Sequence, residues 1–220
     1  MVKSRIHDCE NWIFDWSGTL VDDLAMVLNA TNHVLRHYGK DEIGRDDFRM
    51  RFRLPYSGFY DEILPGVPLP ELEDHFRVGF ADSQAAGVKS PLLPWAVEFL
   101  QCLQARNKRM FILSSMDAPA FDRHARELGV DHFFEATYAG VLDKRDQIHR
   151  VMDSHQLDAA RTVFLGDMCH DVETARHGGV ASIALLTGYQ NAAQLSGSNP
   201  DLMADDLLEI LQLLEAARVD

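Results

Sequence analysis

The sequence predicts an α/β protein whose core is a doubly wound, Rossmann-like parallel sheet with an inserted α-helical cap. After residue 91, short apolar runs alternate with amphipathic helical patterns, which is typical of a parallel sheet with helices on both faces. One earlier apolar run is followed by a long stretch without a strong strand pattern. A chain of 220 residues fits one large domain, or one domain with an insertion, better than two full domains. We therefore expect a core made of residues 1–20 and 91–220 and a cap made of residues 21–90.

The first predicted strand is the apolar run Trp12–Phe14, and the polar loop 15–19 follows it directly. Apolar residues then recur at helical spacing over 22–38, where Asp22 or Asp23 is a suitable N-cap. The rest of the cap has a helical pattern that is interrupted by two proline-containing turns. This order places a helical insertion immediately after the first strand.

The second part of the chain continues the alternation of strands and helices. Glycines close two of the helices, as they commonly do at helix C-termini. The elements that we expect after residue 91 are a helix near 97–103, a strand at 109–113, helices at 120–128 and 144–155, a strand at 162–165, a helix at 172–177, a strand at 180–186, a loop at 188–200 and a leucine-rich helix at 202–217.

Charge and composition exclude several classes of protein. Asp and Glu number 34 against 21 Lys and Arg, a net charge of −13, which disfavours non-specific nucleic-acid binding because that depends on cations neutralising phosphates. An anionic substrate stays possible, since a bound metal ion inverts the local field. The three cysteines form no C-x-x-C pair, and no apolar run is long enough for a membrane span or a secretory signal. We expect a cytoplasmic protein without a membrane partner.

Polar residues of a matching kind follow the predicted strands. They are Asp15, Ser114, the region before Lys144, and Asp167 with Asp171. The carboxyl ends of parallel strands meet at one edge of a sheet, and three carboxylates brought together there repel each other unless a cation lies among them. Carboxylate oxygens suit Mg²⁺. A lysine and a serine hydroxyl beside the metal suit a phosphate dianion, and a carboxylate can act as the nucleophile for phosphoryl transfer.

These residues resemble the haloacid dehalogenase-like hydrolases. The first motif of that family, usually Asp-x-Asp-x-Thr, corresponds to 15–19; the second, an apolar strand ending in Ser or Thr, to 111–114; the third to Lys144; and the fourth, Gly-Asp-x-x-x-Asp, to 166–171. Their order and spacing match over nearly the whole chain. The segments 93–103 and 186–189 also look like the helical-cap branch that contains phosphoglycolate phosphatases.

The resemblance implies a role for each motif residue. Asp15 would be the nucleophile and a metal ligand, and Asp167 and Asp171 would bind Mg²⁺ together with the backbone carbonyl of Ser17. Ser114 and Lys144 would hold the phosphoryl group, with Ser115 as the candidate if the motif is shifted by one residue. Gly18 and Thr19 would complete the phosphate cradle. The implied reaction is hydrolysis of a small phosphorylated metabolite by a monomer or homodimer.

Ser17 departs from the family pattern. Phosphatases of this family normally place a second Asp there to protonate the leaving group, and general acid–base help of that kind is worth roughly 10²–10⁴ in rate. Three alternatives stay open: another acid in the cap, an undemanding leaving group, or a weakened enzyme that mainly binds a phosphorylated ligand. Phosphonoacetaldehyde hydrolases also lack this Asp and use a cap lysine to cleave a C–P bond, but the cap holds only Lys40 and Lys89. Arg51 and Arg53 are candidates for binding an anionic substrate tail, although a charge run is more often a solvated face.

Overall fold

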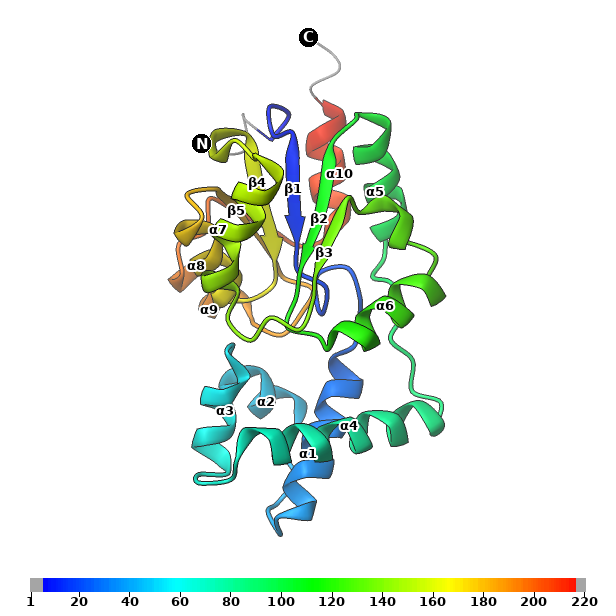
Figure 1. Cartoon of the computed structure of the whole chain (residues 1–220), viewed down its shortest axis with the longest axis vertical. Coiled ribbons are helices and arrows are strands. Elements are labelled where there is room, and N and C mark those ends of the chain that lie inside the picture. Colours follow the sequence, from blue (N-terminus) through cyan, green and yellow to red (C-terminus); the bar gives the residue numbers. More distant parts are fainter. Residues whose placement is uncertain (1–5, 217–220) are drawn as a thin grey trace.

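The computed structural model describes residues 6–216 of the chain. Its centre is a sheet of six parallel strands in the order β3-β2-β1-β4-β5-β6 (Figure 1). The strands are β1 (Asn11–Phe14), β2 (Arg109–Leu113), β3 (Ala136–Tyr138), β4 (Thr162–Gly166), β5 (Ala181–Leu185) and β6 (Leu202–Ala204). The chain moves outward in one direction through β1, β2 and β3 and in the other through β4, β5 and β6. The switch point, where ligands bind in folds of this kind, therefore lies between β1 and β4.

Helices cover both faces of the sheet. On one face α5 (Ala96–Ala105), α6 (Ala118–Glu127) and α10 (Leu207–Ala216) pack on Trp12 and Phe14. On the other, α7 (Lys144–His155) and α8 (Cys169–His177) pack on Ile13. Successive residues of a strand point to opposite faces, so a strand with both faces covered is apolar throughout. This explains why β1 is buried along its whole length.

The helices before residue 90 form a separate hydrophobic cluster, which lies at the carboxyl ends of the strands (Figure 1). They are α1 (Leu24–His37), α2 (Arg45–Arg51), α3 (Tyr56–Ile63) and α4 (Leu69–Ala85). Phe48 and Phe59 lie at the centre of this cluster and are fully buried. Met168 and Tyr189 of the sheet domain join it. The helical segment is therefore seated over the edge of the sheet where the predicted site residues lie.

The predicted fold class is confirmed, and two of its strands were not among the predicted strand ranges. A strand end was expected before Lys144, but no range was predicted for it, and it corresponds to β3. β6 was not expected, and residues 202–204 were wrongly predicted as the start of the last helix. Leu202 and Ala204 are buried while Met203 between them is partly exposed. This alternation is that of a strand paired with β5, so the helix begins only at Leu207. Residue 217, predicted as its end, lies outside the described residues, as do residues 1–5 and 218–220 of the predicted core.

Two further expectations need correction. The predicted loop 188–200 contains the short helix α9 (Ala192–Gly197). Asn191 caps it, because its side chain accepts from the Gln194 N–H while the Gln194 side chain accepts from the Asn191 N–H. Helix α8 begins at Cys169 rather than near Val172, since Asp171 accepts from the Met168 N–H and so caps the first turn. The predicted boundaries of the cap stay a prediction.

No helix within residues 6–216 combines the length and the apolar character that a membrane crossing requires.

Candidate active site

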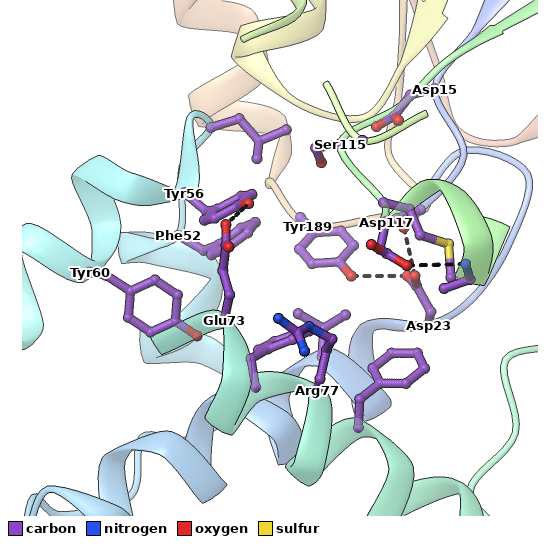
Figure 2. A pocket seen from close by; sticks show the side chains of 18 of the residues that line it. Asp15, Asp23, Phe52, Tyr56, Tyr60, Glu73, Arg77, Ser115, Asp117 and Tyr189 are labelled. Atoms are coloured by element: carbon purple, nitrogen blue, oxygen red, sulfur yellow. Dashed lines mark hydrogen bonds between the residues drawn. The ribbon is translucent and has the colours of Figure 1, made fainter. Parts of the chain in front are cut away.

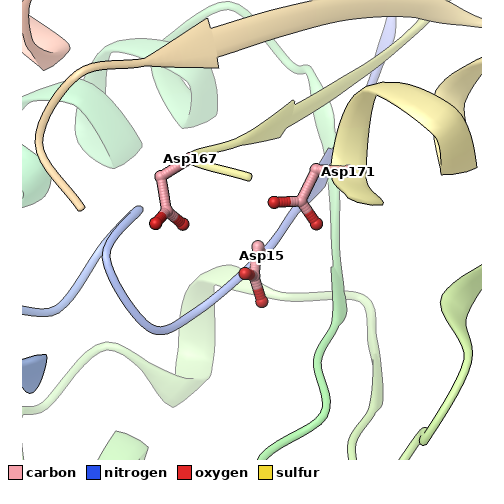
Figure 3. A group of neighbouring side chains, drawn as sticks. All are labelled: Asp15, Asp167 and Asp171. Carbon is pink, nitrogen blue, oxygen red and sulfur yellow. The ribbon is translucent and has the colours of Figure 1, made fainter. Parts of the chain in front are cut away.

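Three buried carboxylates meet at the switch point of the sheet (Figure 3). Asp15 directly follows β1, Asp167 directly follows β4, and Asp171 lies in the first turn of α8. One oxygen of each lies within 4.8 Å of the others, and the three residues are 3%, 0% and 2% exposed. The structure thus brings together the acidic residues that the sequence placed at separate strand ends.

Lys144 supplies the positive charge of this cluster. It is the first residue of α7, is fully buried, and its Nζ lies 2.8 Å from Asp15 Oδ1 and 2.7 Å from Asp171 Oδ1. Its backbone N–H donates to His170 Nε2 at 3.2 Å, which fixes the start of the helix. Burial by itself disfavours the charged ammonium, but the two carboxylates outweigh it and raise the pKa of Lys144 well above its usual value. The lysine is therefore held as a cation.

Backbone and side-chain donors orient the carboxylates. The Trp16 N–H donates to Asp15 Oδ1 at 2.6 Å, the oxygen that also faces Lys144. Asp167 accepts from the Thr19 hydroxyl at 3.0 Å and from the Tyr189 N–H at 2.7 Å. Within residues 6–216, Asp15 Oδ2 receives no hydrogen bond, although the side chain borders a cavity. One oxygen of Asp15 is thus fixed and the other is available for chemistry.

The charges of the cluster call for a further cation. Burial, followed by the negative charge of Asp15 and Asp171, raises the pKa of Asp167 well above its usual value. Burial also raises the pKa of Asp15, against the opposing effect of Lys144. Three carboxylates share one ammonium, so one divalent ion would leave the cluster with no excess negative charge. An all-oxygen donor set of this kind fits Mg²⁺, and Asp15, Asp167 and Asp171 are the residues that would hold it.

Two glycines make room for Asp167. A Cβ on Gly18 would lie 2.4 Å from Asp167 Oδ2, and one on Gly188 would lie 2.0 Å from the same atom. Gly18 also has a φ of +75°, which side-chain-bearing residues rarely adopt. Its N–H donates to the Val21 carbonyl at 2.8 Å, so this amide closes the turn. Gly18 therefore allows the loop 15–19 to lie in contact with Asp167.

Ser17 has a partner that was not expected. Its hydroxyl donates to Asp23 Oδ2 at 2.6 Å, and the Tyr189 hydroxyl donates to Asp23 Oδ1 at 2.9 Å. Asp23 occupies the N-cap position of α1 but makes no side-chain cap hydrogen bond. Burial raises its pKa to about 6, although the Ser17 and Tyr189 hydrogen bonds oppose the shift. Asp23 therefore serves the site and not the helix end.

A cavity of about 560 Å³ opens next to the carboxylates, between the sheet domain and the helical segment (Figure 2). Its sheet-domain side includes Asp15, Ser17, Ser115 and Tyr189. Ser114 does not line it; this residue is buried, and its hydroxyl accepts from the Met116 N–H at 3.2 Å. The assignment of the second-motif serine stays a prediction, with Ser115 the one that borders the cavity.

Several sequence candidates lie away from this cavity. Arg51 and Arg53 do not line it and both pair with Glu62, so the structure does not support their role in binding a substrate tail. Lys40 and Lys89 are also absent from its wall. Trp16 is fully buried against Phe121 of α6, as expected of a packing residue.

Sequence reasoning missed Asp23, Tyr189 and Glu73 as cavity residues. Asp23 looked like a helix cap, and its pairing with Tyr189 spans 166 positions along the chain. Glu73 lies in α4, where a carboxylate on an amphipathic helix looks like an ordinary surface residue. Only the segment containing Tyr189 had drawn attention, through the family resemblance. No local pattern marks the other two.

Comparisons with known proteins give a family match, similar curated proteins and similar solved structures. Residues 12–185 match the family described as haloacid dehalogenase-like hydrolase. A phosphoglycolate phosphatase from Vibrio parahaemolyticus is 25% identical, with 91% of this chain and 94% of that protein covered. A 5′-nucleotidase from Pseudomonas aeruginosa is 26% identical, with 94% and 96% covered. A haloacid dehalogenase-like family hydrolase from Streptococcus pneumoniae has a TM-score of 0.82 at 24% identity, covering 93% of this chain and 98% of that one.

Proposed function

The chain belongs to the haloacid dehalogenase-like hydrolase family and is a phosphohydrolase, and from this premise we propose that it cleaves a phosphomonoester through an aspartyl-phosphate on Asp15. The observation that carries the proposal is the pairing of three buried carboxylates with one buried lysine, in which Asp15 Oδ2 is the one carboxylate oxygen without a donor among residues 6–216. Mg²⁺ is the cofactor that this donor set suits. When bound, it neutralises the phosphate dianion and draws it toward the carboxylates.

In the first step, Asp15 Oδ2 attacks phosphorus. A bond from this oxygen to phosphorus forms, the bond from phosphorus to the ester oxygen breaks, and the ester oxygen takes up a proton from solvent as the alcohol leaves. The Lys144 ammonium lies beside the other Asp15 oxygen at 2.8 Å, where it stabilises negative charge on the phosphoryl oxygens. We assign the neighbouring hydroxyls, Ser114 or Ser115, to the same task.

In the second step, water attacks the aspartyl-phosphate and releases inorganic phosphate. The bond between phosphorus and Asp15 breaks, the carboxylate is restored, and the attacking water gives up a proton. Both steps therefore need a group that moves a proton at the leaving-group side. The Ser17 hydroxyl already donates its hydrogen bond to Asp23. We therefore expect proton transfer to limit turnover when the leaving alcohol is weakly acidic.

The helical segment supports a closed site. Its four helices, α1 to α4, stand over the strand ends (Figure 1). The cavity beside Asp15 is lined by residues of both the helical segment and the sheet domain. We propose that residues 21–90 act as the cap. A cap excludes water from the aspartyl-phosphate and supplies the contacts that select the substrate.

Hydrolysis of a C–P bond is less well supported. That reaction, in the enzymes that resemble this chain, uses a cap lysine, and no lysine lines the cavity within residues 6–216. A protein that only binds phosphorylated ligands would retain the cluster but lack turnover. The Asp15→Asn variant separates such a binding protein from an enzyme.

The proposal is tested with Asp15→Asn. The unaltered protein is expected to hydrolyse acetyl phosphate and para-nitrophenyl phosphate with Mg²⁺ and to lose this activity when the metal is chelated. Asp15→Asn is expected to abolish turnover and to form no phosphoenzyme. Asp22→Asn is the control, because Asp22 is a nearby exposed aspartate outside the cavity wall. Activity that survives in Asp15→Asn refutes the nucleophile, whereas an isolable phosphoenzyme without turnover favours the binding protein.

A further inference from the structure

The cavity beside Asp15 has a wall that indicates the organic part of the substrate. We propose, building on the phosphatase function above, that this part is a flat aromatic ring system of nucleoside size that carries hydrogen-bond donors and no carboxylate. The inference rests on three properties of the cavity: its aromatic walls, the acceptors that face into it, and its volume.

Aromatic side chains line the cavity on the cap side. Phe52 and Tyr56 lie side by side where α2 meets α3, and the Phe52 ring contacts the Tyr189 ring with 5.4 Å between their centroids (Figure 2). Phe76 and Phe80 of α4 complete the wall. Aromatic rings that border a cavity suit a ligand with a ring system of its own, since stacking of a base on an aromatic side chain is worth roughly 1–3 kcal/mol.

A hydrogen-bond acceptor, the Glu73 carboxylate, lies among these rings. Glu73 Oε1 accepts from the Tyr56 hydroxyl at 2.6 Å. Its other oxygen, Oε2, receives no hydrogen bond from any residue in the range 6–216, and the half-buried side chain borders the cavity. A carboxylate oxygen in this setting favours a ligand that donates an N–H or O–H. The Tyr56 bond holds the carboxylate in place for such a donor.

The charges of the interior disfavour a second anionic group on the substrate. Asp23 is 2% exposed and Glu73 is half-buried, and a substrate carboxylate near them would meet like charges. The two arginines of the wall, Arg77 and Arg123, are both exposed, and Arg77 is already paired with Asp74 at 2.6 Å. Apart from Lys144, which is paired with Asp15 and Asp171, these arginines carry the positive charge near the cavity, and water screens it.

Volume favours a large organic group over a two-carbon one. The cavity holds about 560 Å³, which lies within the range of roughly 300–1,000 Å³ typical of pockets that enclose drug-sized molecules. A two-carbon acid esterified with phosphate would leave the aromatic walls uncovered. A nucleoside-sized group would fill the space from Asp15 to α4.

The test compares substrates with the same reactive end. Guanosine 5′-monophosphate and ribose 5-phosphate both release a primary alcohol, so a difference in kcat/KM reports recognition of the base. We expect guanosine 5′-monophosphate to be favoured by roughly tenfold or more, the size of one stacking contact, and to exceed 2-phosphoglycolate as well. Equal or better turnover of ribose 5-phosphate or 2-phosphoglycolate overturns the proposal.

Glu73→Gln tests the acceptor. We expect it to reduce the preference for guanosine 5′-monophosphate over ribose 5-phosphate by about tenfold, as for one lost hydrogen bond to a charged group. Glu71→Gln is a matched control: Glu71 lies on the same helix and accepts from the Tyr38 hydroxyl at 2.6 Å, but it does not line the cavity. The control should retain the full preference. An equal loss in both variants, or in neither, contradicts a specific role of Glu73.

Binding to Asp15→Asn separates this inference from the proposed reaction. Calorimetric titration of that variant with each phosphate in the presence of Mg²⁺ measures recognition without turnover. Tighter binding of guanosine 5′-monophosphate supports the inference even if no phosphate is hydrolysed by the unaltered protein. Hydrolysis of acetyl phosphate together with equal binding of both sugar phosphates retains the phosphatase and overturns the substrate class.

Discussion

Ser17 shows how one residue changes the chemistry expected of a shared motif. Its hydroxyl lies 2.6 Å from Asp23 Oδ2, in the place where related phosphatases have a carboxylate. Replacing Ser17 by Asp would therefore set two carboxylates against each other in a buried site, which is costly. Residues 17 and 23 are therefore coupled, and changing Ser17 to the Asp of the family motif also affects Asp23.

This coupling predicts the behaviour of two variants. Ser17→Asp alone should give no increase in kcat on alkyl phosphates, because repulsion from Asp23 displaces the new carboxylate. Ser17→Asp combined with Asp23→Asn removes the repulsion and should raise kcat by about 10²-fold, the lower end of general acid–base help. Steady-state assays over a series of leaving groups measure this, with Asp23→Asn alone as the control. If the single and double variants have equal kcat, the repulsion argument is wrong.

The buried carboxylates also predict how Mg²⁺ changes stability with pH. Burial raises the pKa of both Asp15 and Asp167 in the folded protein. Without metal, the stability due to these groups is fully present below their unfolded pKa of about 4 and is lost as pH rises through the folded pKa. Bound Mg²⁺ favours the ionised carboxylates, so its stabilising effect should grow over that same range.

Thermal unfolding measures this effect. The rise in Tm caused by Mg²⁺ should be larger at about pH 8 than at about pH 5.5, on either side of neutrality. At a concentration of about 100 times Kd the metal contributes ~2.7 kcal/mol, which amounts to several degrees for a chain of this size. Asp167→Asn is the control and should lose most of the shift at both values. Equal shifts in Tm at the two pH values would contradict the raised pKa of Asp15 and Asp167.

At the scale of secondary-structure elements, the loop after β5 sets the position of Asp167. The Tyr189 N–H in this loop holds Asp167 Oδ2 at 2.7 Å. Gly188 allows the approach, because a Cβ there would lie 2.0 Å from that oxygen. Gly188 has no positive φ, so a substitution acts through the contact and not through backbone strain.

Gly188→Ala should therefore displace Asp167 and weaken the cluster. We expect kcat/KM to fall by at least about tenfold, since misplacing a reacting group by about 1 Å costs as much as 10²-fold. Gly197→Ala is the control, because nothing lies within 4 Å of a Cβ at this position in α9. Kinetics with para-nitrophenyl phosphate and the Mg²⁺ Kd measure the outcome. Normal values of both for Gly188→Ala would contradict the steric argument.

The elements that the sequence predicted are those that carry a complete local pattern. β1 and β4 are buried on both faces, so each contains an apolar run, residues 12–14 in β1 and 163–165 in β4. β3 has only three residues, none of them fully buried, and β6 has three that are good helix formers. Both strands exist because they pair with a neighbour in the sheet, and this tertiary pairing leaves no signal in three residues.

The residues of the candidate site likewise include some that a local sequence pattern marks and some that it does not. Asp15, Lys144, Asp167 and Asp171 could be predicted because each stands at the end or start of an element and the topology brings those ends together. Asp23 joins the site through hydroxyls of other elements. Glu73 belongs to the cavity only because α4 is placed over the sheet. Such contacts depend on how the two parts dock, which no local pattern encodes.

At the scale of the whole molecule, Arg49 is one of the residues that join the helical segment to the sheet domain. Its Nε donates to the Tyr189 carbonyl and its Nη2 to the Gln190 carbonyl, both at 3.3 Å. Gln194 Nε2 of α9 also donates to the Arg49 carbonyl, at 3.2 Å. These bonds join the end of α2 to the loop that also holds Asp167 and Asp23. The contact between the helical segment and the sheet domain and the arrangement of the carboxylates therefore depend on one shared segment of chain.

Removing this link should loosen the closed state more than it disturbs the chemistry. Arg49→Ala loses two hydrogen bonds between the parts, so KM for para-nitrophenyl phosphate should rise by about tenfold, while kcat at saturation changes less because Asp15 and Lys144 keep their places. Arg36→Ala is the matched control, since Arg36 is exposed and pairs with Glu42 inside the helical segment. A fall in kcat with an unchanged KM would instead place Arg49 in the chemical step and contradict a closing role.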